Sequence, residues 1–179
     1  MPRVWLSLGS NIDREKNIRA AVGALKGVFG GLILSPVYEG DAVGSPGGPP
    51  FFNLVVGAET DQGPLELIEL FRRMEADQGR RRGVDKFAPR TLDIDLLTYG
   101  DEVTERGGKA LPRDEVLKYA FVLGPLAEVA PTEVHPLVGR KDGSAVRCPG
   151  RTGDRDPRAR ARLRGVLAPG RTLVVLRSG

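Results

Sequence analysis

The chain has 179 residues, of which 40% are hydrophobic and 28% are charged, as is typical of one soluble globular domain. Its single cysteine, Cys148, excludes an internal disulfide, and no stretch reaches the roughly 20 apolar residues that a membrane span needs. The net charge of +4 arises in residues 140–179, which hold eleven basic and three acidic residues, so that the rest is net acidic. With no signal-peptide pattern at the N-terminus, we expect a cytoplasmic protein whose main part does not bind nucleic acid.

The N-terminal residues predict a strand followed by a helix. Residues 3–8 have the pattern of a strand, with Trp5 in the core. Asp13 follows a short turn and is placed to cap a helix over residues 14–29. The apolar residues of this helix have helical spacing: Ile18, Ala21, Val22 and Leu25.

Two further strands and a second helix follow. Residues 32–40 predict a strand in which Pro36 indicates an edge position or a bulge. A long Gly/Pro-rich loop at 41–50, of a kind that is often functional, leads to a strand over 51–60. Pro64 begins a helix that runs to about residue 78. Its apolar face consists of Leu67, Ile68, Phe71 and Met74.

The remaining elements complete a recognisable order. A basic loop over 79–90 precedes a strand over 93–99, and a short helix follows at 124–130. The order β-α-β-β-α-β predicts an α+β protein of the ferredoxin-like class. We expect an antiparallel sheet with both long helices packed on one face, followed by extra C-terminal elements.

Asp93 and Asp95 interrupt an otherwise apolar strand. Successive side chains of a strand point to opposite faces, so the two carboxylates share one face while the apolar residues around them face the core. Paired oxygen ligands suit Mg²⁺, which uses one or two carboxylates together with substrate phosphates. Taken alone, the pair equally fits two aspartates on a solvated face that pair with arginine.

Five cations lie just upstream of the two acids: Arg80, Arg81, Arg82, Lys86 and Arg90. Guanidinium groups bind phosphate oxygens as forks, and Mg²⁺ bridges such oxygens. Basic residues next to a pair of acids therefore favour a binding site for a nucleotide polyphosphate. The alternative is a solvated basic loop that forms surface ion pairs. The sequence contains neither a Walker A motif nor GxGxxG, which excludes a P-loop enzyme and a Rossmann dinucleotide site.

Phe51 and Asn53 share one face at the start of the third strand. An aromatic ring beside a carboxamide can stack on a flat heterocycle and hydrogen-bond to its edge. A core phenylalanine next to a polar strand residue fits the pattern equally well. His135 and Cys148 have no neighbours that indicate catalysis, and a Ser-His-Asp set is absent from the sequence.

With these residues in view, the chain resembles the 6-hydroxymethyl-7,8-dihydropterin pyrophosphokinase family of folate biosynthesis. The resemblance spans about residues 3–137 and is most specific in FAPRTLDIDLLTYG at 87–100. The other stretches that carry it are LSLGSN at 6–11, VYEG with VG over 37–44, FFNLVV at 51–56, MEADQGRRR at 74–82, LP at 111–112 and AFVLGPLAEVAP at 120–131.

The resemblance implies a ferredoxin-like fold and an ATP-dependent diphosphotransferase. Such an enzyme transfers the pyrophosphoryl group of ATP to the pterin hydroxymethyl group, releases AMP and uses two Mg²⁺ ions. By position, Asp93 and Asp95 would hold both metals, and the catalytic set would add Arg80, Arg82 and Arg90. The pterin would contact Gly40, Val43, Phe51, Asn53 and Phe121, and ATP would contact Arg80, Arg82, Phe87, Arg90, Leu96 and Arg113.

Three departures from the family pattern suggest a divergent subgroup. Arg113 stands where the family usually has histidine, Tyr119 where it usually has a phosphate-binding arginine, and Gly40-Asp41 where it usually has Thr-Pro. These changes keep open a weakly active or inactive paralogue that binds pterin or nucleotide. A ferredoxin-like RNA-binding module is disfavoured, because the strands lack the aromatic and basic RNP signature.

We divide the chain into a pyrophosphokinase domain at 1–139 and a basic Arg/Gly/Pro-rich tail at 140–179. Three interpretations of the tail compete: a disordered segment, which we favour, a nucleic-acid-binding arm, and an out-of-frame C-terminus. We expect small-molecule substrates, a monomer and no membrane partner.

Overall fold

The computed structural model describes residues 1–40, 47–80, 89–106, 108–133 and 135–136, together with the backbone of 163–168 and 171–177. Four helices and nine strands lie in these ranges. In chain order they are β1 (Arg3–Ser10), α1 (Arg14–Phe29), β2 (Ile33–Leu34), β3 (Val37–Gly40), β4 (Phe51–Glu59), α2 (Pro64–Asp77), β5 (Asp93–Tyr99), β6 (Thr104–Arg106), β7 (Lys109–Leu111), α3 (Glu115–Lys118), α4 (Ala120–Val129), β8 (Leu163–Ala168) and β9 (Arg171–Arg177).

The main sheet has the order β5-β1-β4-β3, continued by β9 and β8. β1 is central and pairs antiparallel with both β4 and β5, and β3 pairs antiparallel with β4. Each long helix therefore connects strands that are separated by a third strand, as in a split βαβ unit. The predicted α+β class and the antiparallel sheet with helices packed on it are confirmed.

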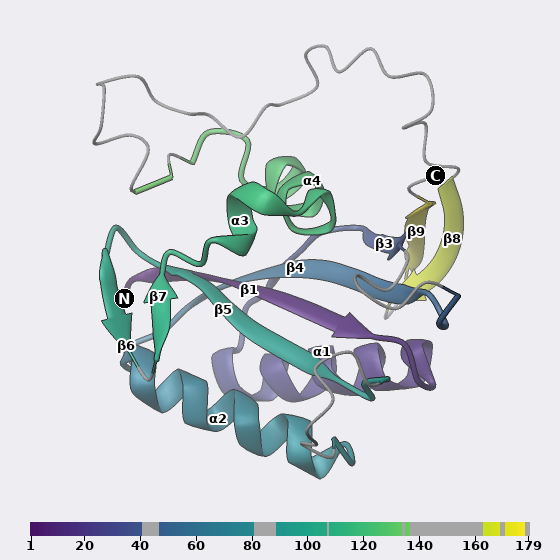
Figure 1. The fold of residues 1–179 in the computed structure, drawn as a ribbon, viewed down its shortest axis with the longest axis horizontal. Coiled ribbons are helices and arrows are strands. Elements are labelled where there is room, and N and C mark those ends of the chain that lie inside the picture. Colours follow the sequence, from purple (N-terminus) through teal and green to yellow (C-terminus); the bar gives the residue numbers. More distant parts are fainter. Residues whose placement is uncertain are drawn as a thin grey trace.

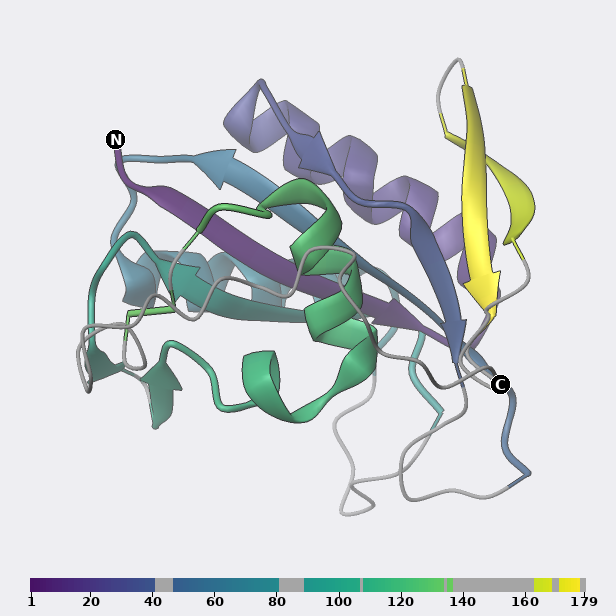
Figure 2. The ribbon, with the colours of Figure 1, turned by 90° about the horizontal axis from the view of Figure 1, so that it is seen from above.

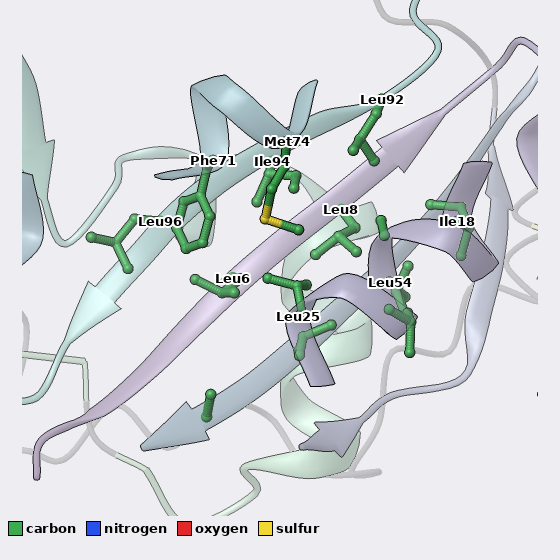
Figure 3. Packing of buried hydrophobic residues seen from close by; sticks show 14 of the residues in the cluster. Leu6, Leu8, Ile18, Leu25, Leu54, Phe71, Met74, Leu92, Ile94 and Leu96 are labelled. Carbon is green, nitrogen blue, oxygen red and sulfur yellow. The ribbon is translucent and has the colours of Figure 1, made fainter. Parts of the chain in front are cut away.

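Both long helices cover the same face of the sheet (Figure 1). Their apolar positions pack on alternate residues of β1, β4 and β5, such as Leu8, Leu54 and Ile94 (Figure 3). The buried residues of α1 are the four that helical spacing predicts, which shows why the periodicity was informative. This core leaves the opposite face of the same strands available for other side chains.

The shorter helices α3 and α4 lie on that opposite face (Figures 1 and 2). Trp5, Val55 and Leu97 point from the sheet into a second apolar cluster, which Val122 and Leu126 of α4 complete. Two side-chain hydrogen bonds attach the helix and the turn after it to the strands. The Tyr38 hydroxyl donates to Glu128, and the Trp5 indole N–H donates to Glu133.

The structure differs from the sequence prediction in the strand expected at 32–40. This strand is interrupted at Ser35 and Pro36, so that β2 and β3 pair separately with β4. Ser35 bridges the break, because its N–H donates to the Val55 carbonyl at 3.0 Å and its hydroxyl accepts from the Val55 N–H at 2.9 Å. Pro36 has no N–H to offer a partner strand, which explains the break at this position.

One helix boundary and one predicted helix cap differ from the sequence prediction. The last helix begins at Ala120, four residues earlier than predicted, because an apolar run fits a strand and a buried helix equally well. Asp13 occupies the position before α1 with a left-handed backbone, but its side chain makes no capping hydrogen bond. The hairpin formed by β6 and β7 was not predicted, since three-residue strands are too short to show periodicity.

The described backbone of the C-terminal segment contains two strands. β8 and β9 form an antiparallel hairpin, and β9 pairs in parallel with β3 at the edge of the main sheet (Figure 1). The run RTLVVL within β9 is rich in residues of high β-propensity, which fits a strand at this position. Among the described helices, none combines the length and the apolar character needed to cross a membrane.

Candidate active site

The candidate site lies on the face of the sheet opposite the long helices. Gly9 of β1 pairs with Asn53 of β4 on one side and with Asp93 of β5 on the other. A Cβ atom added at Gly9 would lie 3.2 Å from Asn53 Oδ1, 3.6 Å from Phe51 Cδ1 and 4.0 Å from Asp93 Cβ. The glycine thus leaves room for the side chains of Phe51 and Asn53, expected at the pterin, and of Asp93, expected at the metals.

Asp93 lies between two arginines. Arg80 Nη1 donates to Asp93 Oδ1 at 2.6 Å, and Arg90 pairs with Asp93 Oδ2. Arg80 also pairs with Glu75, a helix residue whose side chain is only 4% exposed. The Ile94 N–H donates to Glu75 Oε1 at 2.9 Å, so this buried acid is fixed to β5 as well. Glu75 therefore holds the Arg80 guanidinium against Asp93.

Asp95 faces two cations from the segment that follows β5. Lys109 Nζ lies 2.5 Å from Asp95 Oδ1, and Arg113 Nη2 lies 3.8 Å from the same oxygen. Arg113 also donates to Glu115 at 2.8 Å, while its buried Nε–H has no partner among the described residues. Burial by itself raises the pKa of Asp95, but Lys109, Arg113 and Arg80 outweigh it and lower the pKa below its usual range.

The lowered pKa predicts how Asp95 contributes to stability as a function of pH. Because the folded pKa is below the unfolded one, the stabilisation is present above about pH 4 and is lost as the pH falls through the folded pKa. At pH 6 we expect the wild type to exceed Asp95→Asn by about 1 kcal/mol in free energy of unfolding. Urea unfolding at pH 6 and pH 3 should show this difference shrink, and a constant difference would contradict the assignment.

We call these eight charged residues the acid–base cluster: Glu75, Asp93, Asp95, Glu115, Arg80, Arg90, Lys109 and Arg113. Their formal charges cancel, and each belongs to at least one ion pair with another member. A neutral cluster of this kind can accept magnesium and a polyphosphate together, since these also bring opposite charges. In the described part of the chain, no three His, Cys, Asp or Glu residues gather as an all-protein metal site.

The carboxylates of the cluster fit Mg²⁺ if the ion arrives together with a polyphosphate. Two carboxylates on one face supply the hard oxygen ligands that this ion prefers, and it commonly completes its shell with water and substrate phosphate. The Nε–H of Arg113, which has no partner among the described residues, and the fork of Arg90 are donors of the kind that phosphate oxygens accept.

An aromatic pair from α4 and the residue before it lies on the same face of the sheet. The rings of Tyr119 and Phe121 stack with centroids 5.0 Å apart and planes inclined by 17°. Both rings pack against the second apolar cluster. Burial raises the pKa of Tyr38, as does Glu128, so its hydroxyl remains a donor to that acid and ties β3 to α4.

The structure describes the other predicted substrate contacts only in part. Gly40 ends β3 and pairs with Phe51 at the mouth of the Gly/Pro-rich loop. The Leu96 side chain is 2% exposed in the core on the helix-covered face, so only its backbone remains available for ATP. Val43, Arg82 and Phe87 lie outside the described residues.

Three residues of the site were missed by the sequence analysis. Asn11 links the ends of the two loops beside the site, since its Nδ2 donates to the Pro49 carbonyl at 3.2 Å and its Oδ1 accepts from the Arg90 N–H at 2.6 Å. Glu75 had a detectable signal, because it is an acid on the apolar stripe of a helix. Lys109 had no sequence signal of this kind, because the hairpin that carries it was not predicted.

Comparisons with known proteins agree on one family. The model of the 7,8-dihydro-6-hydroxymethylpterin-pyrophosphokinase family matches residues 5–131. A 2-amino-4-hydroxy-6-hydroxymethyldihydropteridine pyrophosphokinase of Pseudomonas aeruginosa is 35% identical over 132 residues, which cover 72% of this chain and 81% of the relative. The Bacillus subtilis protein of the same name is 38% identical over 70% of this chain and 76% of its own. A folate synthesis bifunctional protein of Arabidopsis thaliana is 35% identical over 70% of this chain and 23% of its own.

Proposed function

Because the chain belongs to the 7,8-dihydro-6-hydroxymethylpterin-pyrophosphokinase family, we propose that the acid–base cluster binds Mg²⁺-ATP for its reaction. The protein is an ATP-dependent diphosphotransferase of folate biosynthesis, which transfers the pyrophosphoryl group of ATP to the hydroxymethyl group of 6-hydroxymethyl-7,8-dihydropterin. The products are the pterin diphosphate and AMP. The observation that carries the proposal is a pair of carboxylates on one sheet face with four cations around it.

Asp93 and Asp95 are the proposed magnesium ligands, and we keep the expectation of two ions. Mg²⁺ would neutralise charge on the phosphates as the bond to AMP breaks. Asp93 is held in place by Arg80 and Arg90, which supports a fixed carboxylate position before substrates bind.

Arg80, Arg90, Arg113 and Arg82 are the proposed phosphate contacts. Their guanidinium groups would stabilise negative charge on the pyrophosphoryl group while the pterin hydroxyl attacks the β-phosphorus in line. Arg113 lies near Asp95, which supports the idea that it replaces the cation missing at Tyr119. Positioning and electrostatics would supply most of the rate enhancement.

The pterin would bind beside this cluster, over Gly9. Phe51 would stack on one side of the ring and Phe121 on the other, while Asn53 would hydrogen-bond to the ring edge. The shared position of Phe51 and Asn53 around Gly9, next to Asp93, supports this arrangement. Gly40 and Val43 would line the same pocket, and Phe87 and the backbone of Leu96 would contact ATP.

Asn53→Ala tests the pterin position. The substitution removes the hydrogen bonds to the ring edge and leaves buried polar groups of the pterin unpaired, so we expect pterin affinity to fall by about a hundredfold. Affinity for Mg²⁺ with α,β-methylene ATP should stay within about threefold of the wild type. Calorimetric titration with each ligand separately measures both effects.

Gln62→Ala is the matched control, because Gln62 has the same kind of amide but is exposed in a turn after β4. It should bind both ligands as the wild type does. Pterin affinity that is unchanged in Asn53→Ala, in a variant that unfolds like the wild type, would remove Asn53 from the pterin pocket.

The remaining sequence predictions stay proposals. The family match ends at residue 131, which supports a pyrophosphokinase domain over 1–139 and a separate segment over 140–179. We also propose a monomer in the cytoplasm. The comparisons give no support to the alternative of an inactive paralogue.

A further inference from the structure

The unpredicted hairpin brings Lys109 into contact with Asp95 of the acid–base cluster. Lys109 is the first residue of β7 and pairs with Arg106 next to the hairpin turn. The base of the hairpin is fixed, because Leu111 is buried and the Arg113 N–H donates to the Leu97 carbonyl at 2.8 Å. From this arm the Lys109 ammonium reaches Asp95, and its side chain remains 33% exposed.

We infer that Lys109 is a further phosphate-binding residue, which holds Asp95 before nucleotide binds and moves to the ATP phosphates when Mg²⁺-ATP enters. This inference rests on the proposed function of Asp95 as a magnesium ligand.

The need for an exchange follows from the position of the ammonium. Lys109 Nζ lies 2.5 Å from Asp95 Oδ1, within the space that a cation bound to this oxygen would need. Two cations on one carboxylate oxygen repel each other strongly in a partly buried site. Lys109 must therefore leave Oδ1 when magnesium coordinates this oxygen.

The side chain of lysine is suited to such a move. It is a point charge on a flexible four-carbon stem, with rotatable donors and no fixed fork geometry. Arg113 is less free, since Glu115 also holds its guanidinium at 2.8 Å. The phosphates that arrive with the metal are the nearest new anions, so Lys109 would exchange one anionic partner for another and the cluster would stay near neutrality.

Lys109→Gln separates this role from the alternatives, because it should change two affinities in opposite directions. Mn²⁺ alone, used as a spectroscopic probe in place of Mg²⁺, should bind about threefold more tightly, since a competing cation is removed. Mg²⁺ with α,β-methylene ATP should bind about tenfold more weakly, since a phosphate contact is lost. Electron paramagnetic resonance measures the first affinity, and calorimetry the second.

Lys118→Gln is the control, because Lys118 is an exposed lysine of α3 that pairs with Asp114. It should leave both affinities unchanged, and Lys109→Arg should retain nucleotide affinity within about threefold. If Lys109→Gln binds both Mn²⁺ and the magnesium nucleotide more tightly, Lys109 only competes with the metal for Asp95, and the inference is wrong. If both stay unchanged, the pair with Asp95 is an incidental surface contact, which also overturns it.

Failure of the underlying proposal has a different signature. Asp95→Ala should lose most affinity for Mg²⁺ with α,β-methylene ATP if Asp95 is a magnesium ligand. Undiminished affinity in that variant would reject the metal site itself, whatever Lys109→Gln shows. Loss of affinity in Asp95→Ala without an effect of Lys109→Gln would reject only the role of Lys109.

Discussion

Asp95→Ala should lower kcat/KM for pterin diphosphate formation by about a thousandfold or more. The substitution removes one of the two proposed magnesium ligands and leaves Lys109 and Arg113 facing each other without the acid between them. Charge that develops on the transferring group would then lose its best-placed neutralising partner. Chromatographic measurement of AMP and pterin diphosphate, under conditions where the variant is folded, gives the rate.

Asp114→Ala is the appropriate comparison, because Asp114 belongs to the same segment but pairs only with exposed Lys118 in the described structure. Its kcat/KM should stay within about twofold of the wild type. Comparable rates for Asp95→Ala and the wild type would show that the chemistry takes place elsewhere.

The second large effect concerns Arg80, which holds two acids together. Its side chain is 16% exposed and lies between Glu75 and Asp93, with exposures of 4% and 23%. In Arg80→Gln the two carboxylates lose their shared cation, so we expect the free energy of unfolding to fall by about 2–3 kcal/mol. Turnover should also fall by about a hundredfold, because a phosphate contact is removed. Urea unfolding and the product assay measure the two losses.

A double variant distinguishes the structural role of Arg80 from its catalytic role. Glu75→Gln can still accept from the Ile94 N–H, so Arg80→Gln with Glu75→Gln should recover stability relative to Arg80→Gln alone. Turnover should not recover, since the phosphate contact remains absent. Arg19→Gln, which breaks an exposed pair with Glu15, should cost no more than about 0.5 kcal/mol. Strict additivity of the two substitutions would mean that Glu75 does not hold Arg80.

Most of the fold could be predicted because local patterns and global packing agree. The apolar stripe of α1 and the alternation in β5 correspond to the residues that are buried. The same alternation predicts that Asp93 and Asp95 share one face of the sheet. Failures occurred where the sequence signal is short or ambiguous, as in the hairpin of β6 and β7 and in the apolar run that begins α4.

The candidate site was predictable in its acids and less so in their partners. Arg80 and Arg90 are close to Asp93 in sequence, so their pairing could be anticipated from a loop that leads into the strand. Lys109 reaches Asp95 only because β7 pairs antiparallel with β6, and no local pattern marks that contact. Long-range charge pairing depends on the fold, which a strand or helix pattern alone does not contain.

A crystal structure of the complex with Mg²⁺, α,β-methylene ATP and 6-hydroxymethylpterin tests the central claim most directly. We predict magnesium coordinated by Asp93 and Asp95 at about 2.1 Å, with the β- and γ-phosphates next to Arg80 and Arg90 and the pterin over Gly9. Lys109 should lie on a phosphate oxygen and no longer on Asp95. Nucleotide bound away from these two aspartates, with their arginine and lysine pairs intact, would contradict the assignment of the acid–base cluster as the active site.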